Sequence, residues 1–149
     1  MPYVVETSIG LDRMFLAVLS HALQEEELAD GSRRTVLKLP SILAPIKAAV
    51  LPLVKKDGLP ELAHEIVDTL KWEMPVTYDE KDAVGRRYRR QDAAGTPYCI
   101  TVDHQSLEDR SVTIRHRDSM EQERVAISAL GQKMQESVSF KHWLGSTLA

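Results

Sequence analysis

The sequence has little cysteine, with Cys99 as its single thiol in 149 residues. One thiol excludes an intramolecular disulfide framework and any metal site built from several thiolates. The five histidines include no pair at i,i+4 spacing and none beside the cysteine, so we expect no bound metal. The sequence also lacks a Gly-rich phosphate loop ending in Lys-Ser or Lys-Thr, and it lacks a nucleophile-elbow serine. No complete set of catalytic residues is therefore recognisable from these patterns.

Long apolar runs are also missing. The longest strongly apolar stretch, residues 42–54, is interrupted by Pro45, Lys47 and Pro52. A membrane-spanning helix needs about 20 consecutive apolar residues, so we predict no membrane span. The first residues have neither the basic start and apolar run of a signal peptide nor the Arg-rich character of an organelle address, which predicts a cytoplasmic chain.

Excess charge of one sign is absent from the whole chain but present in one segment. The 22 acidic and 19 basic residues give a net charge of -3, which argues against a general nucleic-acid binder. Residues 84–117, however, contain seven arginines and four acidic residues, a local excess of three positive charges. We therefore expect one basic face on an otherwise acidic protein.

Hydrophobic periodicity predicts an α/β fold. The length of 149 residues suits one ordinary domain and excludes an enzyme that needs about 300 residues. The expected order from residue 46 is β-α-β-α-β-β-α, preceded by a separate strand and helix. The expected elements are strands at 3–5, 35–39, 46–54, 72–78, 98–102 and 111–116, and helices at 11–23, 59–70, 83–93 and from 119 onward. Residues 25–32 would end the first helix and form a boundary, and residues 103–110 would be a polar connection. Helices should cover both faces of a mostly parallel sheet whose last strand is antiparallel.

Three positions carry further expectations. Pro75 should place its strand at an edge of the sheet or at a bulge, because proline cannot donate to a ladder. Gly95 should end the preceding helix in the left-handed conformation. Residues 119–122 fit a capping box at the start of the last helix.

The most basic segment, residues 85–92, is the first candidate site. At helical spacing Arg86, Arg89 and Arg90 share one face, while Tyr88 lies on the flank and can either stack on a ligand or pack inward. Arginines with an aromatic suit single-stranded RNA, whose phosphates take the charge and whose bases stack. The same residues also fit a solvated helix face with structural ion pairs.

A second candidate lies near the N-terminus, where Glu6, Ser8 and Arg13 flank a glycine turn. A carboxylate, a hydroxyl and a guanidinium there could bind an amine, a small polar group and a phosphate. The alternative interpretation is a strand end, a turn and an ordinary arginine in the first turn of a helix.

Long stretches of the chain resemble a known family. Residues 2–13 (PYVVETSIGLDR) resemble the third signature motif of class II aminoacyl-tRNA synthetases of the dimeric glycyl type. The anticodon-binding domain of the same family is resembled by residues 36–39 (VLKL), 43–50 (LAPIKAAV), 85–97 (GRRYRRQDAAGTP), 112–115 (VTIR) and 117–122 (RDSMEQ). The resemblance covers nearly the whole chain, and its motifs are long and in order.

The resemblance implies a domain organisation. Residues 1–28 would be a remnant of the catalytic domain, residues 29–45 a linker with a lead-in strand, and residues 46–149 the anticodon-binding domain. That domain would have three layers, with a mixed five-stranded sheet flanked by helices.

The resemblance also implies a function, which is recognition of the tRNA anticodon within a glycine–tRNA ligase. The parent enzyme would be a homodimer that uses ATP, with Mg²⁺, to attach glycine to its tRNA. Glu6 would meet the glycine ammonium, Ser8 would line the glycine pocket and Arg13 would contact ATP. The tRNA would be contacted by Arg86, Tyr88, Arg89, Arg90 and Arg115. Because the other two signature motifs are missing, we expect this chain alone to be catalytically inactive.

Two alternatives remain at this point. A non-catalytic relative of the same domain acts as an accessory subunit of mitochondrial DNA polymerase, and topology alone is compatible with a flavodoxin-like nucleotide-binding domain.

The first expected helix has apolar residues that would normally pack into the catalytic domain, namely Leu11, Phe15, Val18 and Leu19. In this chain they should dock elsewhere on the domain or bury themselves in a second copy.

Overall fold

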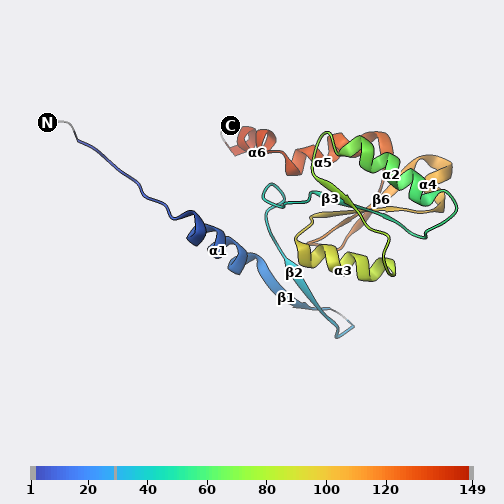
Figure 1. Cartoon of the computed structure of the whole chain (residues 1–149), viewed down its shortest axis with the longest axis horizontal. Coiled ribbons are helices and arrows are strands. Elements are labelled where there is room, and N and C mark those ends of the chain that lie inside the picture. Colours follow the sequence, from blue (N-terminus) through green and yellow to red (C-terminus); the bar gives the residue numbers. More distant parts are fainter. Residues whose placement is uncertain (1–2, 29, 148–149) are drawn as a thin grey trace.

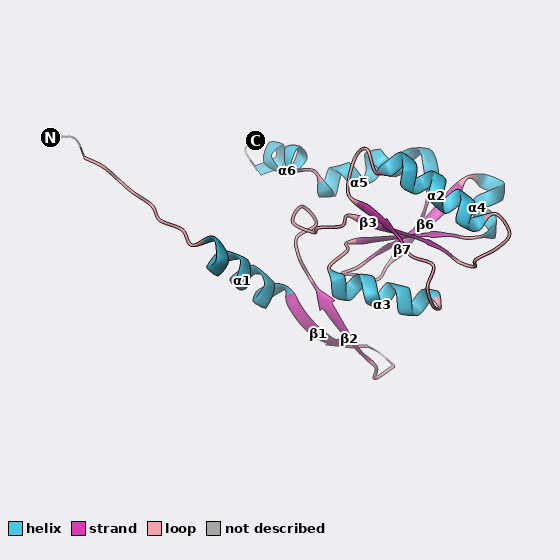
Figure 2. Ribbon diagram, viewed as in Figure 1, coloured by secondary structure: helices cyan, strands magenta, loops and turns pink. Residues whose placement is uncertain are grey.

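The computed structural model describes residues 3–28 and 30–147 and has a three-layer α/β body with an N-terminal arm (Figures 1 and 2). Within those ranges no helix is both long and apolar enough to cross a membrane. The elements are α1 (Leu11–Ala22), β1 (Leu23–Glu27), β2 (Arg33–Leu37), β3 (Ala48–Pro52), α2 (Leu59–Leu70), β4 (Val76–Tyr78), α3 (Val84–Ala94), β5 (Tyr98–Val102), α4 (His104–Asp109), β6 (Ser111–His116), β7 (Gln122–Ala126), a 3₁₀ turn (Ile127–Ala129), α5 (Leu130–Val138) and α6 (Phe140–Thr147).

The central sheet has the strand order β4-β3-β5-β6-β7. Strand β3 is parallel to β4 and β5, whereas β6 is antiparallel to β5 and β7 is antiparallel to β6. Helix α3 covers one face of this sheet, and α2, α4 and α5 lie on the other (Figure 2). The expected mixed five-stranded sheet flanked by helices is confirmed, and the predicted edge position of β4, directly after Pro75, is also confirmed.

The core lies on both faces of β3, in which all five residues are buried. Because side chains alternate along a strand, Ala48 and Val50 face α2 and α5, where most of the apolar core lies. Ala49 and Leu51 join Cys99 in a small cluster on the α3 face. Burial raises the pKa of the Cys99 thiol to about 12, so this residue is a small apolar core group, as expected.

The first strand expected from the sequence, at residues 3–5, is wrong. Residues 3–10 have no secondary structure and their side chains are exposed. The strand pattern there reflects apolar residues that find no neighbouring strand in the part of the chain that the structure describes. The helix expected over 11–23 is confirmed as α1, which lies away from the sheet (Figure 1).

Residues 25–27, expected to end the first helix, instead belong to β1, which forms an antiparallel hairpin with β2. Glu26 explains the difference, because its carboxylate accepts a hydrogen bond from Arg34 Nε at 2.7 Å and also pairs with Lys38. Charge pairing across the two strands makes an acidic run compatible with a strand. Strand β1 lies before the boundary expected between residues 28 and 29, and it pairs with β2, which lies after that boundary.

Two elements in the second half of the domain also differ from the expectation. Residues 104–109 form α4, whose start is capped by reciprocal hydrogen bonds between Asp103 and Ser106. Residues 122–126 form β7 rather than the first turns of a long helix, because their alternating burial suits pairing with β6. The predicted helix therefore begins only at Leu130, and the proposed capping box at residues 119–122 is wrong.

A buried polar network attaches the hairpin to the sheet domain. Arg34, only 3% exposed, donates to Asp92 Oδ2 at 3.1 Å and to the Arg117 carbonyl oxygen at 3.0 Å. Arg115 donates to both oxygens of Asp92, at 2.8 and 3.0 Å. Arg117 donates in turn to the Leu37 carbonyl oxygen at 3.0 Å. The hairpin is therefore held against α3 and the end of β6 by charged hydrogen bonds.

Candidate nucleic-acid interface

Helix α3 presents a basic face to solvent. Its buried residues are Arg87, Gln91 and Asp92, one helical turn apart on the face toward the sheet and hairpin. The remaining arginines of the helix, Arg86, Arg89 and Arg90, are exposed together, as predicted from their spacing. Helix α3 is the next element after β4, and the loop at residues 79–83 joins the two. The first turn of α3 therefore lies at the carboxyl edge of the parallel strands, where ligands of α/β sheets commonly bind.

The three exposed arginines differ in their charge partners. Arg90 forms ion pairs with Asp79 at 2.5 Å and Asp82 at 2.7 Å, so its charge is compensated. Arg89 donates only to neutral acceptors, the Arg33 carbonyl oxygen at 2.9 Å and Ser32 Oγ at 3.2 Å. The Arg86 side chain has no hydrogen-bond or ion-pair partner within residues 3–28 and 30–147. Arg89 forms no ion pair there, although the lowered pKa of Asp30, caused mainly by hydrogen bonds from Ser32, also reflects the charge of Arg89. Of the three arginines, Arg86 therefore has the least compensated charge.

The start of α3 adds to this positive potential. Its first turn contains no acidic residue, and the N-cap residue Ala83 makes no side-chain hydrogen bond to the helix. Backbone N–H groups at a helix start carry partial positive charge that acidic residues usually offset. The neighbouring Gly85 leaves open space where a Cβ would lie. An anion can therefore approach the first turn of this helix closely.

Further cations lie beside this face, and the sequence did not single them out. Arg33 is exposed on β2 beside Arg89, while Lys55, Lys56 and Lys81 lie in the loops that follow β3 and β4. The two loops that hold the lysines also hold four acidic residues, Asp57, Asp79, Glu80 and Asp82, so these loops add no net positive charge. Lys55 lies 3.7 Å from Glu80, a weak pair. The positions of the lysines could have been predicted, because each lysine follows the end of a strand that the sequence indicates. The approach of Arg33 to Arg89 could not, because no local sequence pattern indicates it.

Tyr88 and Arg115 have structural surroundings. The Tyr88 hydroxyl lies 2.6 Å from Thr101 Oγ1, and the Arg115 guanidinium lies 4.8 Å from the Tyr88 ring centroid. Burial raises the pKa of Tyr88. Arg115 is 6% exposed and is bound through two nitrogens by Asp92. Of the two possibilities for Tyr88, inward packing is the one observed, and Arg115 points into the protein rather than to its surface.

The N-terminal candidates lie apart from α3. Glu6 and Ser8 are exposed on the extended segment before α1, and Arg13 is exposed on α1 itself. The arm that carries them extends away from the sheet domain (Figure 1). The structure therefore does not bring these three residues to the basic face.

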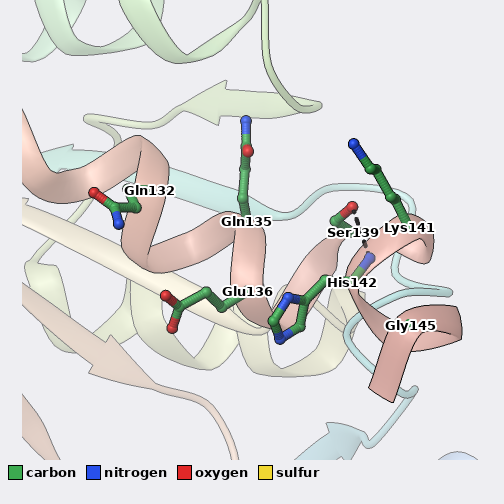
Figure 3. A pocket seen from close by; sticks show the side chains of 7 residues that line it. All are labelled: Gln132, Gln135, Glu136, Ser139, Lys141, His142 and Gly145. Atoms are coloured by element: carbon green, nitrogen blue, oxygen red, sulfur yellow. Dashed lines mark hydrogen bonds between the residues drawn. The ribbon is translucent and has the colours of Figure 1, made fainter. Parts of the chain in front are cut away.

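A hollow lies between α5 and α6. It is lined by Gln132, Gln135, Glu136, Ser139, Lys141, His142 and Gly145 (Figure 3). Lys141 and Gln135 point to the opposite side from Glu136 and His142, so the polar groups do not converge on one ligand position as they do in binding sites. No group of three or more His, Cys, Asp or Glu side chains suited to a metal ion occurs in the described part of the chain.

Comparison with known proteins identifies the class of this α/β domain. Residues 47–137, more than half of the chain, match the family model of the anticodon-binding domain, and the chain belongs to this family. A solved RNA-binding domain of threonyl-tRNA synthetase from Cryptosporidium parvum has the same fold, with a TM-score of 0.62 and 24% identity. That match covers 68% of this chain and 26% of the other.

Curated relatives narrow the class further, because three of the most similar are glycine–tRNA ligases. The chain is 58% identical over 139 residues to the ligase of Rhodopirellula baltica, covering 91% of this chain and 26% of the relative. It is 52% identical to the ligase of Borrelia hermsii, covering 87% and 29%, and 52% identical to that of Alkaliphilus oremlandii, covering 94% and 30%. The chain thus spans between a quarter and a third of the length of these relatives.

Proposed function

We propose that this chain is the anticodon-binding part of a glycine–tRNA ligase and that it contacts tRNA through the exposed face of α3. The observation that carries the proposal is the identity of 58% to a glycine–tRNA ligase over nine tenths of the chain. Two exposed arginines, Arg86 and Arg89, support it, because neither forms an ion pair within residues 3–28 and 30–147. Anticodon bases are presented in a single-stranded loop. A protein surface that recognises them therefore needs cations that bind the phosphates, beside groups that contact the bases.

Different residues have different roles in this proposal. Arg86 and Arg89 bind tRNA phosphates, with Arg33 and the strand-end lysines extending the contact. Arg90 holds the loop after β4 in place through Asp79 and Asp82, next to the phosphate-binding residues. Phosphate contacts fix the position and orientation of the RNA, while the loops at the carboxyl edge are left to read the bases.

The parent enzyme would attach glycine to its tRNA in an ATP-dependent reaction, with Mg²⁺, as a cytoplasmic homodimer. Within it, Glu6 would meet the glycine ammonium, Ser8 would line the glycine pocket and Arg13 would contact ATP. All three are exposed in this chain. The chain alone should therefore not activate glycine, and glycine-dependent exchange of pyrophosphate into ATP above background would contradict this.

The direct test is binding of the chain to a glycine tRNA transcript and to the same transcript with its anticodon replaced, at several fixed salt concentrations. Preference for the native anticodon is the expected result. Equal binding of both transcripts, or binding of neither, would contradict anticodon recognition by this chain on its own. Salt must be fixed because phosphate contacts make the affinity steeply salt-dependent.

No observation favours the two alternatives. The central sheet is mixed rather than wholly parallel, unlike a flavodoxin-like domain, and the three relatives named above are ligases. Saturable binding of a mononucleotide by the chain would favour the nucleotide-binding alternative.

A further inference from the structure

Arg87 is a buried cation at the carboxyl edge of the sheet. It lies on α3 and is 3% exposed. Its Nη1 donates to the Pro52 carbonyl oxygen at 2.6 Å and to the Asp79 carbonyl oxygen at 3.2 Å, and its Nη2 donates to the Leu53 carbonyl oxygen at 3.3 Å. Its Nε is buried without a hydrogen-bond partner. All of its acceptors are therefore neutral backbone oxygens.

The other buried arginines have carboxylate partners. Within residues 3–28 and 30–147, Arg34 and Arg115 pair with Asp92, and Arg117 pairs with Asp118. A buried charge is costly unless a counter-charge compensates it. Arg87 keeps its full positive charge beneath the surface that carries Arg86, so it contributes to the potential that an approaching phosphate meets.

Arg87 also joins three segments mechanically. Pro52 ends β3, Leu53 begins the loop that carries Lys55 and Lys56, and Asp79 begins the loop that carries Lys81. The guanidinium is attached to α3, the helix that presents the exposed arginines. One side chain therefore fixes both strand-end loops relative to the basic helix.

We propose that Arg87 is a positioning residue of the RNA interface. It holds the loops at residues 53–58 and 79–83 against α3, and it adds an uncompensated charge below them, without touching RNA itself. This inference rests on the proposed function, because it concerns the geometry of the same surface.

The test compares four forms of the chain for binding to the glycine tRNA transcript: the unchanged chain, Arg87→Met, Arg87→Lys and the control Arg115→Met. Affinities are measured at a temperature where circular dichroism shows each form folded. Arg87→Met should weaken binding roughly tenfold, the size of one lost charged hydrogen-bond group. Arg87→Lys should regain only part of the affinity, because one ammonium can replace Nη1 at Pro52 and Asp79 but leaves the Leu53 carbonyl oxygen without its Nη2 donor.

The control removes an equally buried arginine at the opposite edge of the sheet, where Asp92 keeps a second partner in Arg34. It should lower thermal stability but change affinity less than about twofold. A folded Arg87→Met protein that binds like the unchanged chain would overturn the inference, as would an equal loss of affinity in Arg115→Met.

Amide hydrogen exchange gives a second readout that general destabilisation does not mimic. Residues 53–58 and 79–83 should exchange faster in the Arg87 variants than in Arg115→Met, and RNA should protect them in the unchanged chain. If Arg87→Met does not fold, full affinity and full protection in Arg87→Lys would still contradict the inference. Absence of RNA binding by the unchanged chain would instead contradict the proposed function, so the two failures are distinguishable.

Discussion

At the scale of single residues, a buried carboxylate decides which arginines are structural. Asp92 is completely buried and accepts hydrogen bonds from Arg34 and Arg115, residues that lie 58 and 23 positions away in the sequence. Asp92 is thereby the buried counter-charge that both guanidiniums share, and Glu26 is a second carboxylate for Arg34. The arginines that remain for a ligand are those that this carboxylate cannot reach, on the other face of α3.

Replacing this carboxylate should be severely destabilising. Asp92→Asn leaves the buried Arg115 without a counter-charge and Arg34 with Glu26 alone, which should lower the free energy of unfolding by about 3–5 kcal/mol. Urea unfolding followed by circular dichroism measures the loss. The control is Asp68→Asn, which removes an exposed carboxylate paired with Lys71 and should change stability little. Similar stabilities for the two variants would show that the buried network does not hold the hairpin.

The exposed arginines should separate by their effect on salt dependence. Arg86→Gln should lower the slope of log affinity against log salt concentration by about one, because one phosphate contact is lost. Arg90→Gln should leave the slope unchanged, because Arg90 is already paired with Asp79 and Asp82. Binding of the glycine tRNA transcript at four or more salt concentrations measures both slopes. A slope lowered by Arg90→Gln and not by Arg86→Gln would reverse the proposed roles.

At the scale of elements, α3 depends on its C-terminal glycine. Gly95 has φ of +81° and ends the helix in the left-handed conformation, as the sequence predicted. A Cβ at this position would also lie 3.2 Å from the Leu37 side chain and from its carbonyl oxygen. The glycine therefore both stops the helix and lets the hairpin approach it.

Two alanine substitutions in the same helix should have opposite effects. Gly95→Ala should lower the free energy of unfolding by about 1–2 kcal/mol, because a left-handed backbone is strained for any residue with a Cβ. Gly85→Ala should raise it by roughly 0.5–1 kcal/mol, because alanine is the better helix former and the space is open. Thermal unfolding of both variants checks the signs, and a stabilising Gly95→Ala would contradict the packing against Leu37.

At the scale of the whole molecule, the N-terminal arm leaves apolar surface exposed. Leu11, Phe15 and Leu16 on α1 are 78%, 64% and 65% exposed, beside a groove that reaches Leu39 and Leu43. An apolar surface of this kind usually marks an interaction site.

The chain by itself should therefore self-associate with increasing concentration. Sedimentation equilibrium should detect dimers, and the double variant Leu11→Ser with Phe15→Ser should abolish them. The control Trp72→Ser removes an apolar side chain that is 84% exposed just after α2, outside the residues that line the groove, and should leave association intact. A monomer at every concentration, with α1 resistant to protease, would instead indicate that the arm docks on its own domain.

By itself, the sequence determined the elements whose signals are local. The apolar stripe of α2, the glycine stop of α3 and the buried run of β3 were all predicted, because periodicity and turn residues act over a few positions. The resemblance to the synthetase family and the shared face of Arg86, Arg89 and Arg90 were also legible in the sequence.

Only the tertiary structure decided the features that depend on distant partners. Residues 122–126 are a strand because β6 lies beside them, and residues 23–27 are a strand because β2 does. The charge state of the interface was decided in the same way, since Arg115 is neutralised by Asp92 while Arg87 meets only backbone oxygens. A sequence gives the number of charges on a segment, but the free charge depends on which groups folding brings within hydrogen-bond distance.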